Sequence, residues 1–259
     1  MLGIDEIQSF FPEPLHKFKG FMLKEYLQYK ILQIVFESSF GNKLVFLGGT
    51  CLRIVHGNQR FSEDLDFDNL NLEEKEFETI SFEIQNSLEK EGYLVEIQNR
   101  FRGAFHCLVK FPKLLFDSGL SGYEEEKILI QLDTEAQNYE FVPKTHILNR
   151  FDVFCPIKVA PIELLLAQKF FAILNRKRNK GRDFFDVVFI MSKTQTPDYN
   201  YLNQKIGVGS GKELKSRILE HCEKINMGEM VADVAPFLFS EKDKNKVLFF
   251  TEFIKQQSL

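Results

Sequence analysis

The 259-residue chain has no tryptophan, only four cysteines and no apolar run of membrane-spanning length. No C-x-x-C motif or Cys/His pair has zinc spacing, which excludes a zinc-stabilised fold. The first residues lack the basic and apolar regions of a signal peptide, so we expect an intracellular, cytoplasmic protein without a membrane partner. In a reducing cytoplasm we expect free thiols at Cys51, Cys107, Cys155 and Cys222.

An excess of positive charge is also missing. The formal net charge is −4, which excludes a uniformly basic nucleic-acid-binding surface and leaves room only for a local basic patch. The sequence contains no P-loop and no Ser/His/Asp or Cys/His pattern with nucleophile spacing. Its five histidines form no obvious cluster. The candidate chemistry therefore involves carboxylates and glycines.

Apolar spacing divides the chain into a mixed first part and a helical second part. The patterns predict helices over 20–40, 50–57 and 71–92, and strands over 42–47, 65–69, 93–100, 104–111 and 127–136. Residues 142–160 have the pattern of a linker with some extended structure, and from Pro161 onward the chain is mostly helical. We therefore expect an α+β domain over residues 1–150 and a mainly helical domain over residues 151–259.

One segment of the first part, FLGGTCLRIVHGNQRFSEDLDFDN, combines two glycines with closely spaced aspartates. Asp64 and Asp66 are two residues apart, so on a strand both carboxylates point to the same face. Their mutual repulsion favours a divalent cation, and Mg²⁺ binds one or two carboxylates together with phosphate oxygens and water. Asp68 has the same parity and is either a third ligand or a residue past the end of the strand.

A glycine turn precedes these aspartates. Gly48 and Gly49 would let a triphosphate approach the backbone, and Thr50 would cap a short helix whose N-terminal N–H groups attract anions. Taken separately, acidic residues at a strand end are usually solvated, and a Gly-Gly pair is usually only a turn. Together, between two predicted strands, they favour nucleotidyl transfer with two metal ions.

The pattern GGT-x-L…R-x-S-x-D-L-D-F resembles the AbiEii-type family of polymerase-β-like nucleotidyltransferases, toxins of abortive-infection and toxin–antitoxin systems. The resemblance implies an α+β fold, in which a nucleotidyltransferase domain with a small mixed sheet is followed by a mainly helical domain. It implies an NTP substrate and two Mg²⁺ ions, with Mn²⁺ as an alternative. It also adds Arg60 and Ser62, which match the R-x-S element, to the expected nucleotide-binding residues.

A third acid is often found on a later strand in this superfamily, as a general base or metal ligand. Asp133 is the candidate, in a predicted strand with Gln131, Asp133 and Glu135 on one face. This face is either a solvated surface or the third catalytic position. Glu135 is a weaker substitute for Asp133.

The helical part contains a lysine on an apolar stripe. Lys169 lies in the helix that Pro161 is expected to begin, and such a lysine usually reaches out to water. A compact ammonium can instead hold a phosphate. The resemblance favours the phosphate role, because the family's second motif is a lysine followed four residues later by an apolar residue, here Lys169 and Ile173.

A further family motif, R-D-x-x-D, is matched by Arg182, Asp183 and Asp186. Asp183 is expected at a helix start, where it could cap N–H groups, with Asp186 close to the same face. The resemblance implies that one of them orients Lys169 or Arg182, or interacts with the base or metal-bound water, and Asp183 ranks slightly first. The preceding basic run, RKRNKGR, is either a solvated turn or a contact for RNA or triphosphate.

From these features we expect Mg²⁺-dependent transfer of a nucleotide from an NTP to an acceptor hydroxyl, and relatives suggest the 3′ end of tRNA. The expected catalytic residues are Asp64, Asp66, Asp133, Lys169 and Asp183, the first three also being metal ligands. The expected nucleotide-binding residues are Gly48, Gly49, Thr50, Arg60, Ser62, Lys169, Arg182 and Asp186. Transfer to a protein or small molecule, and non-catalytic nucleotide or RNA binding, stay open. A toxin would also have a cognate antitoxin as partner.

Overall fold

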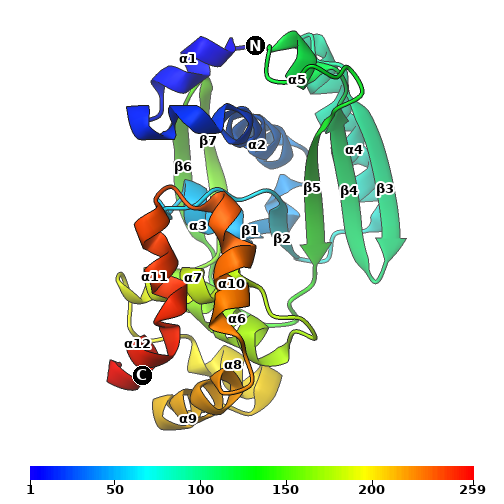
Figure 1. The fold of residues 1–259 in the computed structure, drawn as a ribbon. Helices are drawn as coiled ribbons and strands as arrows, with labels where there is room; N and C mark the ends of the chain where they lie inside the picture. The colour runs from blue at the N-terminus through cyan, green and yellow to red at the C-terminus, as the bar shows by residue number, and fades with distance from the viewer. The chain divides into compact units, whose positions relative to one another are not determined.

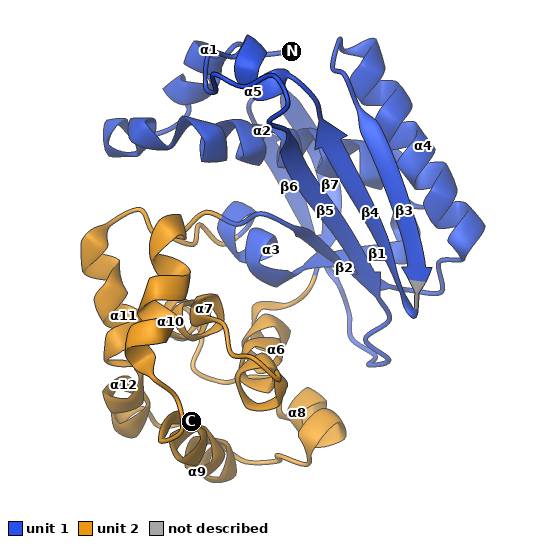
Figure 2. Cartoon of the chain, turned by 45° about the vertical axis from the view of Figure 1, so that its right-hand side comes forward, with its two compact units in different colours: residues 1–55, 62–159 blue, residues 56–61, 160–259 orange. Residues whose placement is uncertain are grey.

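The computed structural model describes residues 1–101 and 103–259. The chain divides into two compact units, which Figure 2 shows in different colours. The sheet unit comprises residues 1–55 and 62–159, and the helical unit comprises residues 56–61 and 160–259. The expected boundary after residue 150 therefore has to move to residue 159, and a short segment of the first part belongs to the helical unit.

The sheet unit is built on a seven-stranded mixed sheet, as expected from the α+β pattern (Figure 1). The strand order is β3-β4-β5-β2-β1-β7-β6, in which β2 runs parallel to β5 and β1 runs parallel to β7, while the other neighbours are antiparallel. The strands are β1 Leu44–Leu47, β2 Leu65–Asn69, β3 Glu96–Arg102, β4 Ala104–Phe111, β5 Ile128–Glu135, β6 Lys144–Arg150 and β7 Val153–Val159.

The linker expected over residues 142–160 is instead the β6–β7 hairpin. Alternate residues of β7 are buried, from Val153 to Val159, because successive side chains of a strand point to opposite faces and one face of β7 packs into the core. Pro156 interrupts the sequence pattern, since proline cannot donate to a strand ladder. The hairpin turn contains Phe151 with φ +57°, a conformation uncommon for residues other than glycine. Because this turn lacks a glycine, the sequence gives no clear indication of a hairpin here.

Two long helices supply much of the sheet unit's core. In α4, Phe77, Ile80, Ile84 and Leu88 form a buried stripe at helical spacing, and each side chain contributes about 1.5–3 kcal/mol relative to leaving it exposed. The helices of this unit are α1 Ile4–Ser9, α2 Lys19–Glu37, α3 Gly48–Ile54, α4 Glu74–Lys90 and α5 Leu114–Asp117, with 3₁₀ turns at Glu13–Phe18 (η1) and Gly41–Lys43 (η2).

The helical unit has the all-helical character expected from residue 161 onward. Phe184 and Phe250 meet in its core, with ring centroids 4.9 Å apart. Its helices are α6 Ile162–Asn175, α7 Gly181–Met191, α8 Tyr199–Ile206, α9 Gly211–Cys222, α10 Met227–Val234, α11 Asn245–Leu248 and α12 Phe250–Gln256, with 3₁₀ turns at Ala235–Phe237 and Glu241–Lys244.

Two expectations from the sequence concern membrane spans and cysteines. Over the part of the chain that the structure describes, no helix is long and apolar enough to cross a membrane. The four cysteines are free thiols, as expected, and all of them are buried.

Candidate active site

The sheet places two of the predicted acids side by side. Asp66 on β2 and Asp133 on β5 are Cα partners in the parallel register, although 66 intervening residues separate them in sequence. Neighbouring strands in register direct paired side chains to the same face, and both aspartates are half-buried there. The structure therefore brings the candidate third acid beside the first motif.

Asp64 lies just before β2, and a buried threonine fixes its backbone. The Thr50 hydroxyl donates a hydrogen bond to the carbonyl oxygen of Asp64. Helix α3 begins at Gly48, with Leu47 as its N-cap, so the expectation that Thr50 caps this helix was wrong. Because Thr50 is fully buried, its contribution is to position the backbone of Asp64, and its burial argues against a direct contact with a triphosphate.

Gly48 lies directly against the Asp66 carboxyl group. A Cβ atom added at this position would overlap Oδ2 of Asp66 and lie 2.8 Å from its Cγ. Gly48 also has φ +79°, which L side chains rarely adopt. The glycine is therefore required both by the backbone conformation and by the space that the Asp66 carboxylate occupies.

If Asp66 is catalytic, as the sequence predicts, a Gly48→Ala substitution should lower the rate of nucleotidyl transfer about 100-fold, because displacing a catalytic group by about 1 Å can have an effect of this size. Initial rates at saturating NTP would measure the loss. The matched control is Gly57→Ala, since Gly57 has φ +74° and no heavy atom lies within 4 Å of its added Cβ. An equal loss in both variants would mean that backbone strain, and not the Asp66 contact, causes the effect.

Two side chains hold Asp133: His106, which the sequence analysis missed, and Gln131, which it placed on the same strand face without predicting the contact. His106, its antiparallel partner on β4, lies with Nδ1 2.6 Å from Asp133 Oδ1. Gln131 donates to both carboxylate oxygens, at 2.8 and 3.0 Å. The histidines showed no cluster in the sequence because the pairing is created by strand register. Reading 104–111 and 127–136 as an antiparallel pair would have revealed it.

The carboxylates of this face suit a hard divalent cation. Oxygen donors are the ligands that Mg²⁺ prefers, and it normally completes its coordination with phosphate oxygens and water. Within residues 1–101 and 103–259, no three His, Cys, Asp or Glu side chains converge into a complete metal site. Any cation bound at this face would therefore have to take further ligands from outside the protein, and phosphate oxygens and water are the ones that Mg²⁺ accepts.

Asp68, considered as a third ligand or a residue past the strand, lies inside β2. It is 2% exposed, and its Oδ1 accepts a hydrogen bond from the Gln137 backbone N–H at 2.8 Å. Asp68 therefore anchors the segment after β5.

Ser62, expected to bind nucleotide, is half-buried, and its carbonyl oxygen accepts a hydrogen bond from Gln28 at 3.0 Å.

The helical unit contains the second predicted constellation as a buried ion cluster. Arg60 donates to both carboxylate oxygens of Asp186, from Nε at 2.8 Å and from an NH₂ group at 2.7 Å. Asn58 donates to the same carboxylate at 2.8 Å. Arg60 is 1% exposed, so this burial argues against the expected direct contact between Arg60 and a nucleotide. Its role is to hold the segment 56–61 on α7.

Lys169 on α6 completes this cluster. Its ammonium lies 2.8 Å from Asp183 and 2.8 Å from Asp186, so both acids of the R-D-x-x-D motif orient it. Burial acts to lower the pKa of Lys169, but the charges of the two aspartates outweigh burial and raise it. Lys169 therefore stays protonated inside the helical unit, and it does not reach out to water as an isolated lysine would.

The two aspartates of the cluster are not equivalent. Burial acts to raise the pKa of Asp186, but the charges of Arg60 and Lys169 outweigh it and lower the pKa to about 2. One oxygen of Asp183, Oδ2, has no hydrogen-bond partner and lies 3.3 Å from Nε of Arg176. Asp183 lies in the first turn of α7 without capping it, because the N-cap is Lys180.

The basic run ends beside this cluster. Arg176, Lys177 and Arg178 are exposed in the turn between α6 and α7, and Lys180 forms an ion pair of 3.7 Å with Asp233. The Arg182 guanidinium stacks over the Phe237 ring at 4.8 Å. The first three cations of the run are therefore solvent-exposed, and one of them, Arg176, also reaches Asp183.

Residues 30–238 match the family described as Nucleotidyl transferase AbiEii toxin, Type IV TA system. Comparison with curated proteins gave no match. JHP933 from Helicobacter pylori has a similar fold, with a TM-score of 0.57 and 16% identity over 91% of this chain and 90% of that chain. A second H. pylori protein, a proposed nucleotidyltransferase, gives a TM-score of 0.57 and 17% identity over 93% of this chain and 99% of that chain.

At these identities the two solved structures show the fold. The family match covers the first motif, the Asp133 strand and the buried ion cluster, which is most of the chain. The pairing of Asp66 with Asp133 beside the glycine turn at Gly48 also fits a nucleotidyltransferase. The chain therefore belongs to the AbiEii family of nucleotidyltransferase toxins of type IV toxin–antitoxin systems.

Proposed function

We propose that this nucleotidyltransferase is a Mg²⁺-dependent toxin that transfers a nucleoside monophosphate from an NTP to the 3′-hydroxyl of tRNA. The observation that carries the proposal is the pairing of Asp66 with Asp133, with the Gly48 backbone packed against the Asp66 carboxylate. Carboxylates side by side repel each other, and a bound cation relieves that repulsion. Modified tRNA ends would block translation, which fits a toxin restrained by an antitoxin and used in abortive infection.

The protein would contribute little covalent chemistry to this reaction. When bound, Mg²⁺ would stabilise the charge that develops on the α-phosphate and the leaving pyrophosphate. The acceptor oxygen forms a bond to the α-phosphorus, the bond to the bridging oxygen of the β-phosphate breaks, and pyrophosphate leaves. Asp64 and Asp66 would hold the cation, and Asp133 would accept the hydroxyl proton. His106 and Gln131 keep the Asp133 carboxylate in place.

For the helical unit we propose a phosphate-binding role for Lys169. An ammonium has three N–H donors, and its contacts with Asp183 and Asp186 need only two. The two carboxylates would keep the charge fixed and the third donor directed at a phosphate oxygen. The exposed cations of the α6–α7 turn would add contacts to RNA phosphates, which provide affinity but no sequence choice.

Incubation with total tRNA, Mg²⁺ and each of four α-labelled NTPs, followed by a denaturing gel, tests the proposal. We expect label on tRNA with one or two of the NTPs. EDTA should abolish the label, and excess Mg²⁺ should restore it. Mn²⁺ in place of Mg²⁺ would test the alternative cation.

Three outcomes would contradict parts of the proposal. Pyrophosphate release with a labelled protein band or small molecule would replace tRNA by another acceptor. Labelling that persists in EDTA would show that the transfer does not need Mg²⁺. NTP binding without pyrophosphate release, with every lane blank, would mean that the chain binds nucleotide without catalysis under these conditions.

A further inference from the structure

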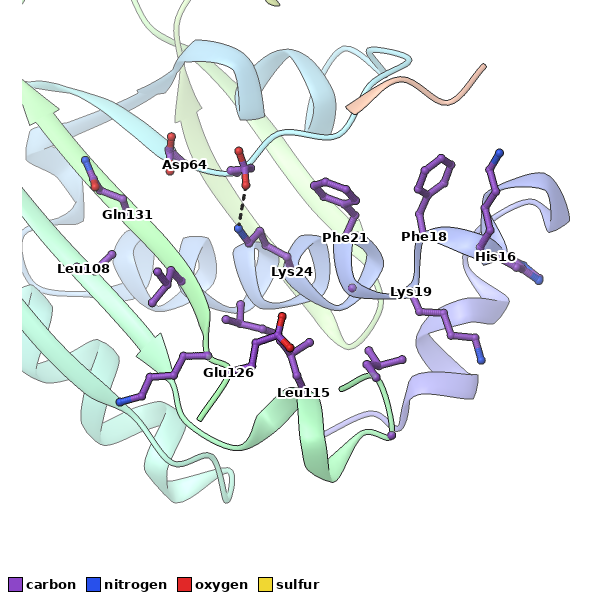
Figure 3. A pocket seen from close by; sticks show the side chains of 18 residues that line it. His16, Phe18, Lys19, Phe21, Lys24, Asp64, Leu108, Leu115, Glu126 and Gln131 are labelled. Atoms are coloured by element: carbon purple, nitrogen blue, oxygen red, sulfur yellow. Dashed lines mark hydrogen bonds and ion pairs between the residues drawn. The ribbon is translucent and has the colours of Figure 1, made fainter. Parts of the chain in front are cut away.

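The sheet unit contains a cavity of about 980 Å³ that the proposed transfer reaction has not used. It lies between η1 with the first turns of α2, the open face of β4 and β5, and the segment from α5 to β5. Figure 3 shows the lining side chains, with Asp64 and Gln131 toward one end and Phe18 and Phe21 toward the other. Its volume is at the upper end of the range for small-molecule sites.

One end of the cavity reaches the candidate catalytic carboxylates. Asp64 and Gln131 both line it, and Gln131 donates to Asp133. Leu108 and Gln131 are partners in the β4–β5 register, and this pair lies two residues along each strand from the pair His106 and Asp133. The floor of the cavity is therefore the strand face that carries Asp133, so a molecule in the cavity would point one end at this acid.

The other end combines aromatic rings with positive charge. Phe18 and Phe21 lie with ring centroids 6.5 Å apart, and the Lys17 ammonium lies 4.9 Å from the Phe18 centroid. Lys19 also lines this end. In the described part of the chain, neither Lys17 nor Lys19 forms an ion pair with a carboxylate. By contrast, Lys24 in the middle of the cavity is paired with Glu63 at 3.3 Å.

We infer that this cavity holds the unpaired 3′-terminal nucleotides of the acceptor RNA. Sites for single-stranded nucleic acid combine aromatic side chains, on which bases stack, with cations that follow the phosphates. Here the bases would contact Phe18 and Phe21, the phosphates would meet Lys17 and Lys19, and the terminal hydroxyl would point toward Asp133. The inference rests on the proposed function, whose acceptor it locates in the sheet unit.

A role as the NTP pocket fits the cavity less well. The described residues that line it do not include Gly48, the glycine packed against Asp66. Its aromatic end is separated from Asp64 by the Lys24–Glu63 ion pair. A chain of several nucleotides can occupy both ends at once.

Three variants test the inference: Lys19→Glu reverses a charge, Phe21→Ala removes a ring, and Leu129→Trp fills the cavity from β5. Leu129 is 44% exposed, so enlarging it should not disturb the core even if Phe21→Ala fails to fold. Matched controls outside the cavity are Lys75→Glu and Phe82→Ala on α4, both exposed. Fluorescence anisotropy would measure binding of a 5′-labelled RNA hairpin with a four-nucleotide 3′ overhang and of the same hairpin with a blunt end.

We expect the wild-type protein to prefer the overhang, and each cavity variant to weaken overhang binding roughly tenfold. The KM for tRNA should rise by a similar factor while the KM for NTP changes less than twofold, and the controls should match wild type. Unchanged overhang binding in the cavity variants would overturn the inference, as would a rise in the KM for NTP alone. If wild type labels no tRNA, the proposed acceptor fails, and the anisotropy series still decides whether the cavity binds a single strand.

Discussion

Replacing Asp66 by asparagine should lower nucleotidyl transfer by a factor on the order of 10³ or more, because the side chain loses the charge that we propose to hold Mg²⁺. Asp66 is half-buried, and asparagine has nearly its shape, so the fold should persist. Asp64→Asn should have a similar effect. Asp133→Asn should also be severe, because Asp133 is the proposed proton acceptor. Initial rates of label transfer, with thermal melting of each variant, would check these expectations.

Glu135→Gln is the matched control for these variants. Glu135 lies on β5 with the same parity as Asp133, but it is exposed. If Asp133 is the third acid, Glu135→Gln should keep nearly full activity while Asp133→Asn loses it. The reverse result would transfer the role to Glu135. Retention of more than about a tenth of the activity by Asp66→Asn would remove the metal-binding role of Asp66.

Asp186→Asn should destabilise the helical unit by about 3–5 kcal/mol, the usual effect of removing one partner from a buried ion pair. The asparagine would leave Arg60, which is 1% exposed, facing a neutral side chain, and Lys169 with one carboxylate. Denaturant unfolding would measure the loss. Glu213→Gln in the same unit is the control, because the exposed Glu213–Arg217 pair should contribute only about 0.2–1 kcal/mol.

The lowered pKa of the Asp186 carboxylate leads us to expect that the free energy of unfolding depends on pH. The pKa of Asp186 falls from 3.8 to about 2 in the folded protein, so its contribution is present above pH 3.8, is complete about one pH unit higher, and is lost as the pH falls toward 2. A shift of this size corresponds to about 2 kcal/mol. Unfolding free energies at pH 5 and pH 3 should therefore differ more for wild type than for Asp186→Asn. A pH dependence that is the same in both proteins would contradict the assignment.

Local patterns predicted the chemistry of the first motif and the elements around it. The α+β class, the strand after the glycine turn, the helices over residues 20–40 and 71–92 and the helical second part all follow from apolar period and turn residues, which act over short distances. The hairpin of β6 and β7 was missed because Pro156 and the turn at Phe151 obscure its alternation.

The sequence by itself determined which residue types are available: two glycines before an Asp-x-Asp pair, one lysine on an apolar helix, and an R-D-x-x-D segment. Only the tertiary structure decided which of them meet. Strand register set Asp133 beside Asp66 and His106 beside Asp133, and burial turned Arg60 and Thr50 into groups that hold Asp186 and Asp64 in place. The physical reason is that such contacts join residues far apart in sequence, and register and desolvation, which set them, have no local sequence signal.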